Sequence, residues 1–272
     1  MPAISDNLLH FLGRACKDDP SEQFNIFKKI IEGGLRCGHE NMHFGENIIS
    51  NQIVCFTDIP LSECHQHTAI YGKFSIGFKK SFVKMCGGNP VSYFVDFPCA
   101  PETYMPSIAA RGIFLYNLKH RVRAFKAIEN ILNSFPDAAL TLPNGEIAFN
   151  RQDLSDYVAA ETYCLSFYKQ TGDLGPARDE TSEIDLYYKE REWRIIPSHS
   201  AGKIKLITED GDGLFFLQFS RKDVNVIVVP NEEIRRSAVD YFISLRNSTD
   251  PRLKSFGDNI PPVVNYDELN RW

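Results

Sequence analysis

Apolar residues recur every three or four positions in several segments, which is the spacing of one face of a helix. Residues 21–32 carry such a stripe and end at Gly33 and Gly34, two residues that suit a helix C-terminus. The longest stripe predicts a helix from about Leu115 to Phe135. Its buried side is marked by Leu118, Val122, Phe125, Ile128 and Leu132. Further helices are predicted at Leu154–Lys169 and from Asn231, as N-cap, to about Leu245.

Short apolar runs bounded by turn residues predict strands between these helices. They lie at Ile53–Thr57, Phe74–Phe78, Val91–Val95, Ile204–Ile207, Leu214–Phe219 and Val224–Val229. Residues 4–12 predict a short strand or turn and 62–71 a short helix or loop, whereas the polar stretch 38–52 predicts a loop. Strands and helices do not alternate regularly, which favours an α+β fold over a doubly wound sheet.

The stretch Tyr187–Pro197 combines charged, aromatic and branched residues and predicts a strand. Alternation then places Glu190, Glu192 and Arg194 on one face, an arrangement suited to holding a cation or a ribose. An ion-paired edge strand, or a helical turn with Glu190 and Arg194 paired, is the structural alternative.

The amino-acid composition is that of an ordinary globular protein. Net charge is −5 and 43% of the 272 residues are hydrophobic, so a general nucleic-acid binder is not indicated. No apolar run approaches the length of a membrane span, and the seven scattered cysteines suit a reduced, cytoplasmic protein. We expect one domain over 1–272, with a helical insertion at about 100–170 and a C-terminal tail at about 248–272.

Common catalytic motifs are absent. The chain has no Gly-x-Gly-x-x-Gly, Walker-type, Gly-x-Ser-x-Gly or His-Glu-x-x-His sequence, which disfavours Rossmann, P-loop, hydrolase and zincin functions. Cys55, Cys64, His65 and His67 match no standard zinc spacing, so no metal is expected.

A basic stripe lies on the long predicted helix. Lys119, Arg123 and Lys126 recur at i, i+4 and i+7, opposite the apolar side. Such a stripe suits contacts with nucleic-acid phosphates, although a solvated helix face is the ordinary explanation.

The motifs in chain order resemble the AbiGi-like abortive-infection family of bacterial phage-resistance proteins, over residues from about 8 to 230. The most specific segments are Phe56-Thr57-Asp58-Ile59-Pro60 and Glu190-Arg191-Glu192-Trp193-Arg194, preceded by His10-Phe11 near the start. The layout is similar, more loosely, to ADP-ribosyltransferase toxins of toxin–antitoxin phage-defence systems. Their usual pattern is His or Arg in the first strand, an aromatic or Ser/Thr in a middle strand, and Glu-x-Glu or Gln-x-Glu late.

This resemblance implies an ADP-ribosyltransferase-like split mixed sheet with flanking helices. It implies Glu192 as the catalytic acid and Glu190 as its companion. The residues implied in NAD binding are His10, which would hold the nicotinamide ribose, with Phe11, Arg14, Phe56, Thr57 and Tyr71. A lone His beside apolar residues is otherwise a core histidine. The loop at 170–185 is where this fold usually selects its acceptor.

The function expected from the resemblance is transfer of ADP-ribose from NAD to a macromolecule, more readily RNA than protein, with Lys119, Arg123 and Lys126 contacting the acceptor. A restraining antitoxin or inhibitory protein is an expected partner. An NAD glycohydrolase, and a non-catalytic sensor or binding module of a defence system, are the alternatives.

Overall fold

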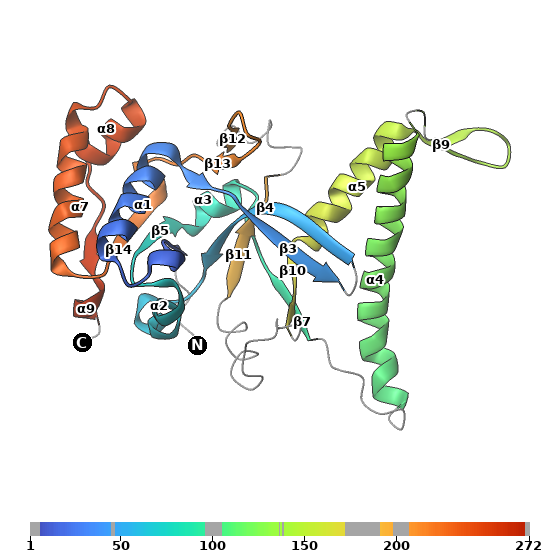
Figure 1. Ribbon diagram of the computed structural model, residues 1–272, viewed down its shortest axis with the longest axis horizontal. Coiled ribbons are helices and arrows are strands. Elements are labelled where there is room, and N and C mark those ends of the chain that lie inside the picture. Colours follow the sequence, from blue (N-terminus) through green and yellow to red (C-terminus); the bar gives the residue numbers. More distant parts are fainter. Residues whose placement is uncertain are drawn as a thin grey trace. The chain divides into compact units, whose positions relative to one another are not determined.

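The computed structural model describes residues 6–44, 47–95, 105–135, 137, 139–171, 191–197 and 207–269. The chain forms two compact units (Figure 1). Unit 1 comprises Met1–Gly38, Gln52–Pro90 and Leu186–Trp272, and unit 2 comprises His39–Asn51 and Val91–Asp185. The helical insertion expected at about 100–170 therefore belongs to unit 2.

A mixed sheet forms the centre of unit 1. Its strand order is β15-β14-β5-β1-β4-β11-β6. Strand β3 pairs with β4 beside this path, and β3 from His39 onward and the first part of β4 belong to unit 2. The pairing of β14 with β15 is parallel, whereas β1, β5 and β11 are paired antiparallel to their neighbours. The strands are β1 Asn7–Phe11, β3 Gly38–Phe44, β4 Asn47–Thr57, β5 Ser75–Lys79, β6 Asn89–Pro90, β11 Glu192–Ile195, β14 Val224–Val229 and β15 Val263–Asn265. The prediction of an α+β fold with a mixed sheet is confirmed.

Helices and a small second sheet complete unit 1. The second sheet joins β2 Leu35–Arg36, β12 Ile207–Glu209 and β13 Phe215–Leu217. The helices are α1 Pro20–Gly33, α2 His65–Tyr71, α3 Lys80–Met85, α7 Glu232–Ser244, α8 Pro251–Asp258 and α9 Tyr266–Leu269. Short 3-10 turns lie at Arg14–Cys16, Leu61–Glu63, Arg221–Asp223 and Leu245–Asn247. As predicted, Gly34 (φ 93°) ends α1 and the Asn231 side chain caps α7.

The main core lies on one face of the central sheet. Strand residues Leu8, Phe56 and Phe78 are at most 1% exposed there. They belong to one buried cluster with Phe27 of α1 and Phe242 of α7. Burying side chains of this size supplies most of the stabilisation of unit 1, at about 1.5–3 kcal/mol each.

Unit 2 is built on two helices. Its elements are β7 Ser92–Val95, α4 Met105–Ser134, β8 Leu140–Thr141, β9 Ile147–Phe149, α5 Arg151–Leu165 and β10 Tyr168–Thr171. Strands β7 and β10 pair in parallel, and Asn150 caps α5. The apolar side predicted for α4 is confirmed, since Leu118, Val122 and Phe125 are at most 3% exposed.

Three segments were predicted wrongly. The helix predicted at Leu154–Lys169 ends at Leu165, and Tyr168–Thr171 form strand β10. Residues 38–52 are not a loop but form β3 and most of β4, since backbone pairing holds this polar hairpin although few of its side chains, such as Met42 and Ile49, are buried. The C-terminal segment is not an unpatterned tail, because Asp250 caps α8 and β15 pairs with β14. Phe256 at 0% and Tyr266 at 3% exposure anchor this segment to unit 1.

Candidate functional site

Three central strands carry the motifs that the sequence singled out. Strand β4 lies between β1 and β11, so the segments around His10, Thr57 and Glu192 are neighbours although they are far apart in sequence. Thr57 pairs with Leu9 on one side and with Glu192 on the other. Because directly paired residues point to the same face, the Thr57 and Glu192 side chains share one face of the sheet.

A buried ion pair marks this face. Nε of Arg194 donates to Oε1 of Glu192 at 2.8 Å, with Arg194 0% and Glu192 6% exposed. The predicted sharing of a face by these two residues is confirmed. The prediction of an edge strand as the alternative is wrong, since β11 lies between β4 and β6.

The backbone just before Glu192 is unusual. Arg191 has φ 42°, the left-handed region that a residue with a side chain rarely adopts. Its carbonyl accepts a hydrogen bond from the Asp58 N–H at 3.2 Å, which ties the start of β11 to the end of β4. The residue that precedes Glu192 is thus held in a constrained backbone conformation. Glu190 lies outside the described residues.

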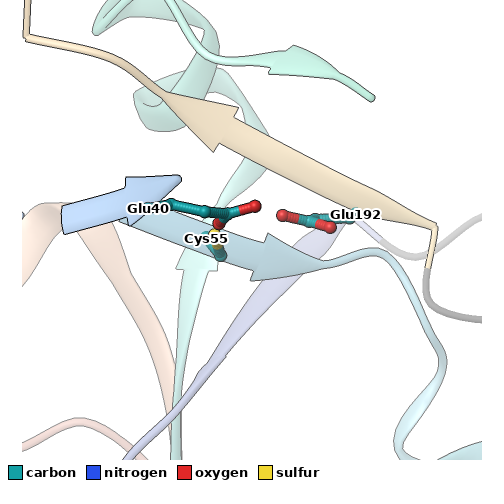
Figure 2. Close-up of side chains that lie close together, drawn as sticks. All are labelled: Glu40, Cys55 and Glu192. Carbon is teal, nitrogen blue, oxygen red and sulfur yellow. The ribbon is translucent and has the colours of Figure 1, made fainter. Parts of the chain in front are cut away.

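Cys55 stands beside the ion pair. It pairs with Arg194 across β4 and β11, and its Sγ lies within 4.8 Å of a Glu192 carboxylate oxygen (Figure 2). Glu40, also labelled in Figure 2, is on β3 and belongs to unit 2. In the described part of the chain, Cys64, His65 and His67 do not join Cys55 in a group with metal-ligand spacing.

His10 occupies the place where two strands separate. Strands β1 and β5 pair over five residues, but β1 and β4 pair only at Leu9 and Thr57. Beyond that point, Nδ1 of His10 lies 2.9 Å from the Cys55 carbonyl oxygen and its ring is 5.8 Å from that of Phe56. Burial lowers the pKa of His10, although the Cys55 carbonyl opposes this, so the imidazole bridges the strands in its neutral form.

Aromatic rings gather at the end of β1. Phe11 shares the Glu192 face by alternation from Leu9. Its ring lies 6.1 Å from the rings of both His67 and Tyr71, which stack on each other at 5.9 Å. The Arg14 guanidinium lies 5.4 Å from the Tyr71 ring centroid. The structure therefore brings together Phe11, Arg14 and Tyr71, and adds His67, for which the sequence predicted no role.

Phe56 is placed apart from these residues. It is 1% exposed in the main core, on the face opposite Glu192, where it pairs with Trp193. Its ring packs edge-on against Phe78 at 5.7 Å. Phe56 therefore packs in the core on the other side of the sheet from Glu192. Of the two neighbouring residues Phe56 and Thr57, only Thr57 faces Glu192.

The expected acceptor residues lie on α4 of unit 2. Arg123 is exposed, whereas Lys126 pairs with Glu129 at 2.8 Å and the neighbouring Arg121 pairs with Glu161 at 2.7 Å. The side chain of Lys119 is outside the described part of the chain, as is the expected acceptor loop from residue 172 to 185. The stripe is thus partly neutralised by acidic neighbours.

His67 gives the site a measurable pH dependence. Burial lowers its pKa from 6.5 to about 4, and its Nε2 has no hydrogen-bond partner among the described residues. Because the unfolded chain binds the proton first, stability present above pH 6.5 is lost as pH falls toward 4, by about 3 kcal/mol. His67→Phe, which keeps the ring stack, should remove this part of the slope in urea unfolding at stepped pH. His65→Gln at the exposed neighbour should keep it; equal slopes in all three proteins would contradict the assignment.

The fold and the site define an α+β protein whose mixed sheet gathers a His-bearing strand, a Thr-bearing strand and a strand with a buried Glu–Arg pair. Residues 36–230 match the family model described as "Putative abortive phage resistance protein AbiGi, antitoxin". The match covers more than half of the chain, and the chain belongs to this family of abortive phage resistance. The resemblance inferred from sequence is confirmed, with β1 and its His10 lying before the matched residues.

The family description differs from the expected role in one respect. It names an antitoxin, whereas the sequence suggested a toxin-like transferase. No curated protein and no solved structure matches the chain. Among the described residues, no helix is long and apolar enough to cross a membrane.

Proposed function

We propose that this chain is an NAD-dependent ADP-ribosyltransferase of phage defence, with Glu192 as its catalytic carboxylate. The observation that carries the proposal is the adjacency of β1, β4 and β11, with Glu192 directly opposite Thr57. The resemblance to ADP-ribosyltransferases implies a His, a Ser/Thr or aromatic residue, and a late Glu on three separate strands. Here these strands are neighbours in one sheet. Thr57 and Glu192 share a face, whereas alternation from Leu9 places His10 on the opposite face, beside Phe56.

The chemistry suits a fixed carboxylate. Breaking the bond between nicotinamide and ribose builds positive charge on the sugar, and nicotinamide leaves as a neutral molecule. A carboxylate held beside the sugar stabilises this charge as it develops, which lowers the barrier. Glu192, held by Arg194 at 2.8 Å, supplies such a group.

The neighbouring side chains suit the rest of NAD. In this proposal the flat nicotinamide ring stacks against the Phe11, His67 and Tyr71 rings, which lie within 6.1 Å of one another. Arg14, above Tyr71, supplies positive charge for the diphosphate. The ribose contact that the resemblance implies for His10 would fall to Nε2, since Nδ1 faces the Cys55 carbonyl, and the ring lies beside Phe56 on the face opposite Glu192.

Labelled NAD tests the proposal and separates its alternatives. The protein is incubated with the label and with host and phage extracts, and the product is digested with nuclease or protease. Nicotinamide release with labelled macromolecule supports a transferase, and release without it supports an NAD glycohydrolase. No NAD turnover under any condition would reject both.

A non-catalytic antitoxin is the second candidate. It is favoured by the family description and by the burial of Glu192, which is 6% exposed and paired. In that case the Glu192–Arg194 pair is structural, and the defence role depends on a protein partner. Loss of defence in Glu192→Gln, without loss of folding, would argue against this candidate.

For the acceptor we propose RNA, contacted by the stripe of Lys119, Arg123 and Lys126. Three phosphate contacts give a slope of about −2 to −3 for log affinity against log salt. Changing all three residues to Glu should abolish labelling of RNA and spare NAD hydrolysis. The triple change of Lys29, Lys84 and Lys222 to Glu, at three exposed lysines of unit 1, is the matched control. Label that survives nuclease but not protease would show a protein acceptor instead.

A further inference from the structure

Arg194 has no role in the function proposed so far beyond contact with Glu192, yet its position is unusual. It is the largest fully buried side chain among the described residues, at 0% exposure, and lies on an interior strand. Removing a guanidinium from water is costly, and an apolar pair of the same volume is often as stable as a buried ion pair. Stability alone therefore does not account for Arg194.

We propose that Arg194 is a positioning residue that keeps Glu192 ionised and fixed in orientation. The two residues are at i and i+2 of β11, so they share a face, and the Nε–Oε1 distance is 2.8 Å. The inference rests on the proposed function for its catalytic consequence, but the pairing itself does not depend on it.

The burial of Glu192 explains why such a residue is required. A carboxyl group that is only 6% exposed favours its neutral form, because burial disfavours charge. A guanidinium in direct contact favours the charged form. A neutral carboxyl could not stabilise a developing cation on the sugar, so Arg194 would act on the reaction through the charge of Glu192.

The backbone fixes the same group independently. Arg191, immediately before Glu192, is held at φ 42° with its carbonyl bonded to the Asp58 N–H. The Cα of Glu192 is therefore set by the backbone at Arg191 and by its pairing with Thr57, and its carboxylate by Arg194. Such double restraint suits a group that must meet a transition state without rearranging.

Kinetics of four variants test the inference. They are Arg194→Met, Arg194→Lys, Glu192→Gln and the double variant Glu192→Gln with Arg194→Met. If Arg194 acts only through Glu192, Arg194→Met lowers kcat for nicotinamide release by about 10²–10³, as Glu192→Gln does. The double variant then falls no further, KM changes little, and Arg194→Lys recovers part of kcat. Losses that multiply in the double variant would overturn the inference.

Two measurements need no NAD turnover and separate this inference from the proposed function. With ¹³C-labelled glutamate at pH 7, the Glu192 signal, assigned by its absence in Glu192→Gln, should be that of a carboxylate in wild type and Arg194→Lys. In Arg194→Met, the Glu192 signal should be that of a neutral carboxylic acid. The double variant should melt closer to wild type than either single variant, since it removes both charges of the buried pair together. A carboxylate signal in Arg194→Met would refute the pairing role even if NAD is turned over. So would a loss of melting temperature in the double variant that equals the sum of the losses in the two single variants. A protein without NAD turnover that shows both effects would reject only the proposed function.

Discussion

Replacing Glu192 with Gln should lower kcat for nicotinamide release by about 10²–10³, the effect of removing one preorganised charge at a developing cation. The amide keeps the size of the side chain and an oxygen that can accept from Arg194 Nε, but it carries no charge. Steady-state nicotinamide release, with NAD at saturation, measures the change.

Folding must be followed in the same experiment, because Glu192 is buried with Arg194. Removing one member of a buried ion pair costs about 3–5 kcal/mol, so a thermal melt accompanies each assay, at a temperature where the variant remains folded. Glu209→Gln, on an exposed strand position of unit 1, is the matched carboxyl control and should be unchanged. A folded Glu192→Gln protein with wild-type turnover would remove Glu192 from the catalytic role.

Replacing Gly257 with Ala should destabilise unit 1 by about 3 kcal/mol, at the upper end of overpacking effects. An added Cβ would meet Arg246 N and lie 2.7 Å from the Leu245 carbonyl carbon. These are backbone atoms, which cannot turn aside as a side chain would. The gain in helix propensity from Gly to Ala, about 1 kcal/mol, has the opposite sign and is smaller.

Urea unfolding of Gly257→Ala and Gly33→Ala tests this contact. Nothing lies within 4 Å of a Cβ added at Gly33 in α1, so its Ala variant should be as stable as wild type or slightly more stable. Equal midpoints for the two variants would show that α8 is not packed against Leu245–Asn247 in solution, and that the C-terminal segment behaves as the tail predicted from sequence.

Local patterns in the sequence determined the helices. In α4, Leu118, Val122 and Phe125 recur at helical spacing, and each is at most 3% exposed. Capping residues fixed the ends, as Gly34 does for α1 and Asn231 for α7. These patterns involve residues within one or two helical turns of each other, so they predict the helices without knowledge of the tertiary structure.

Part of the site could also be predicted from the local sequence. Alternation along one strand put Glu192 and Arg194 on the same face, and the structure joins them. The sequence did not show that this pair would be buried, that Arg194 would hold the carboxylate, or that His67 would stack with Phe11 and Tyr71. Those facts depend on which elements cover each face of the sheet.

The sequence by itself thus determined the α+β class, the main helices, the late strand with its paired charges and the family. Tertiary structure alone decided that 38–52 forms a hairpin, that β15 joins the sheet, and that Thr57 rather than Phe56 faces Glu192. The physical reason is that strand partners and register are set by residues far apart in sequence, and a shift of one residue turns every side chain to the other face.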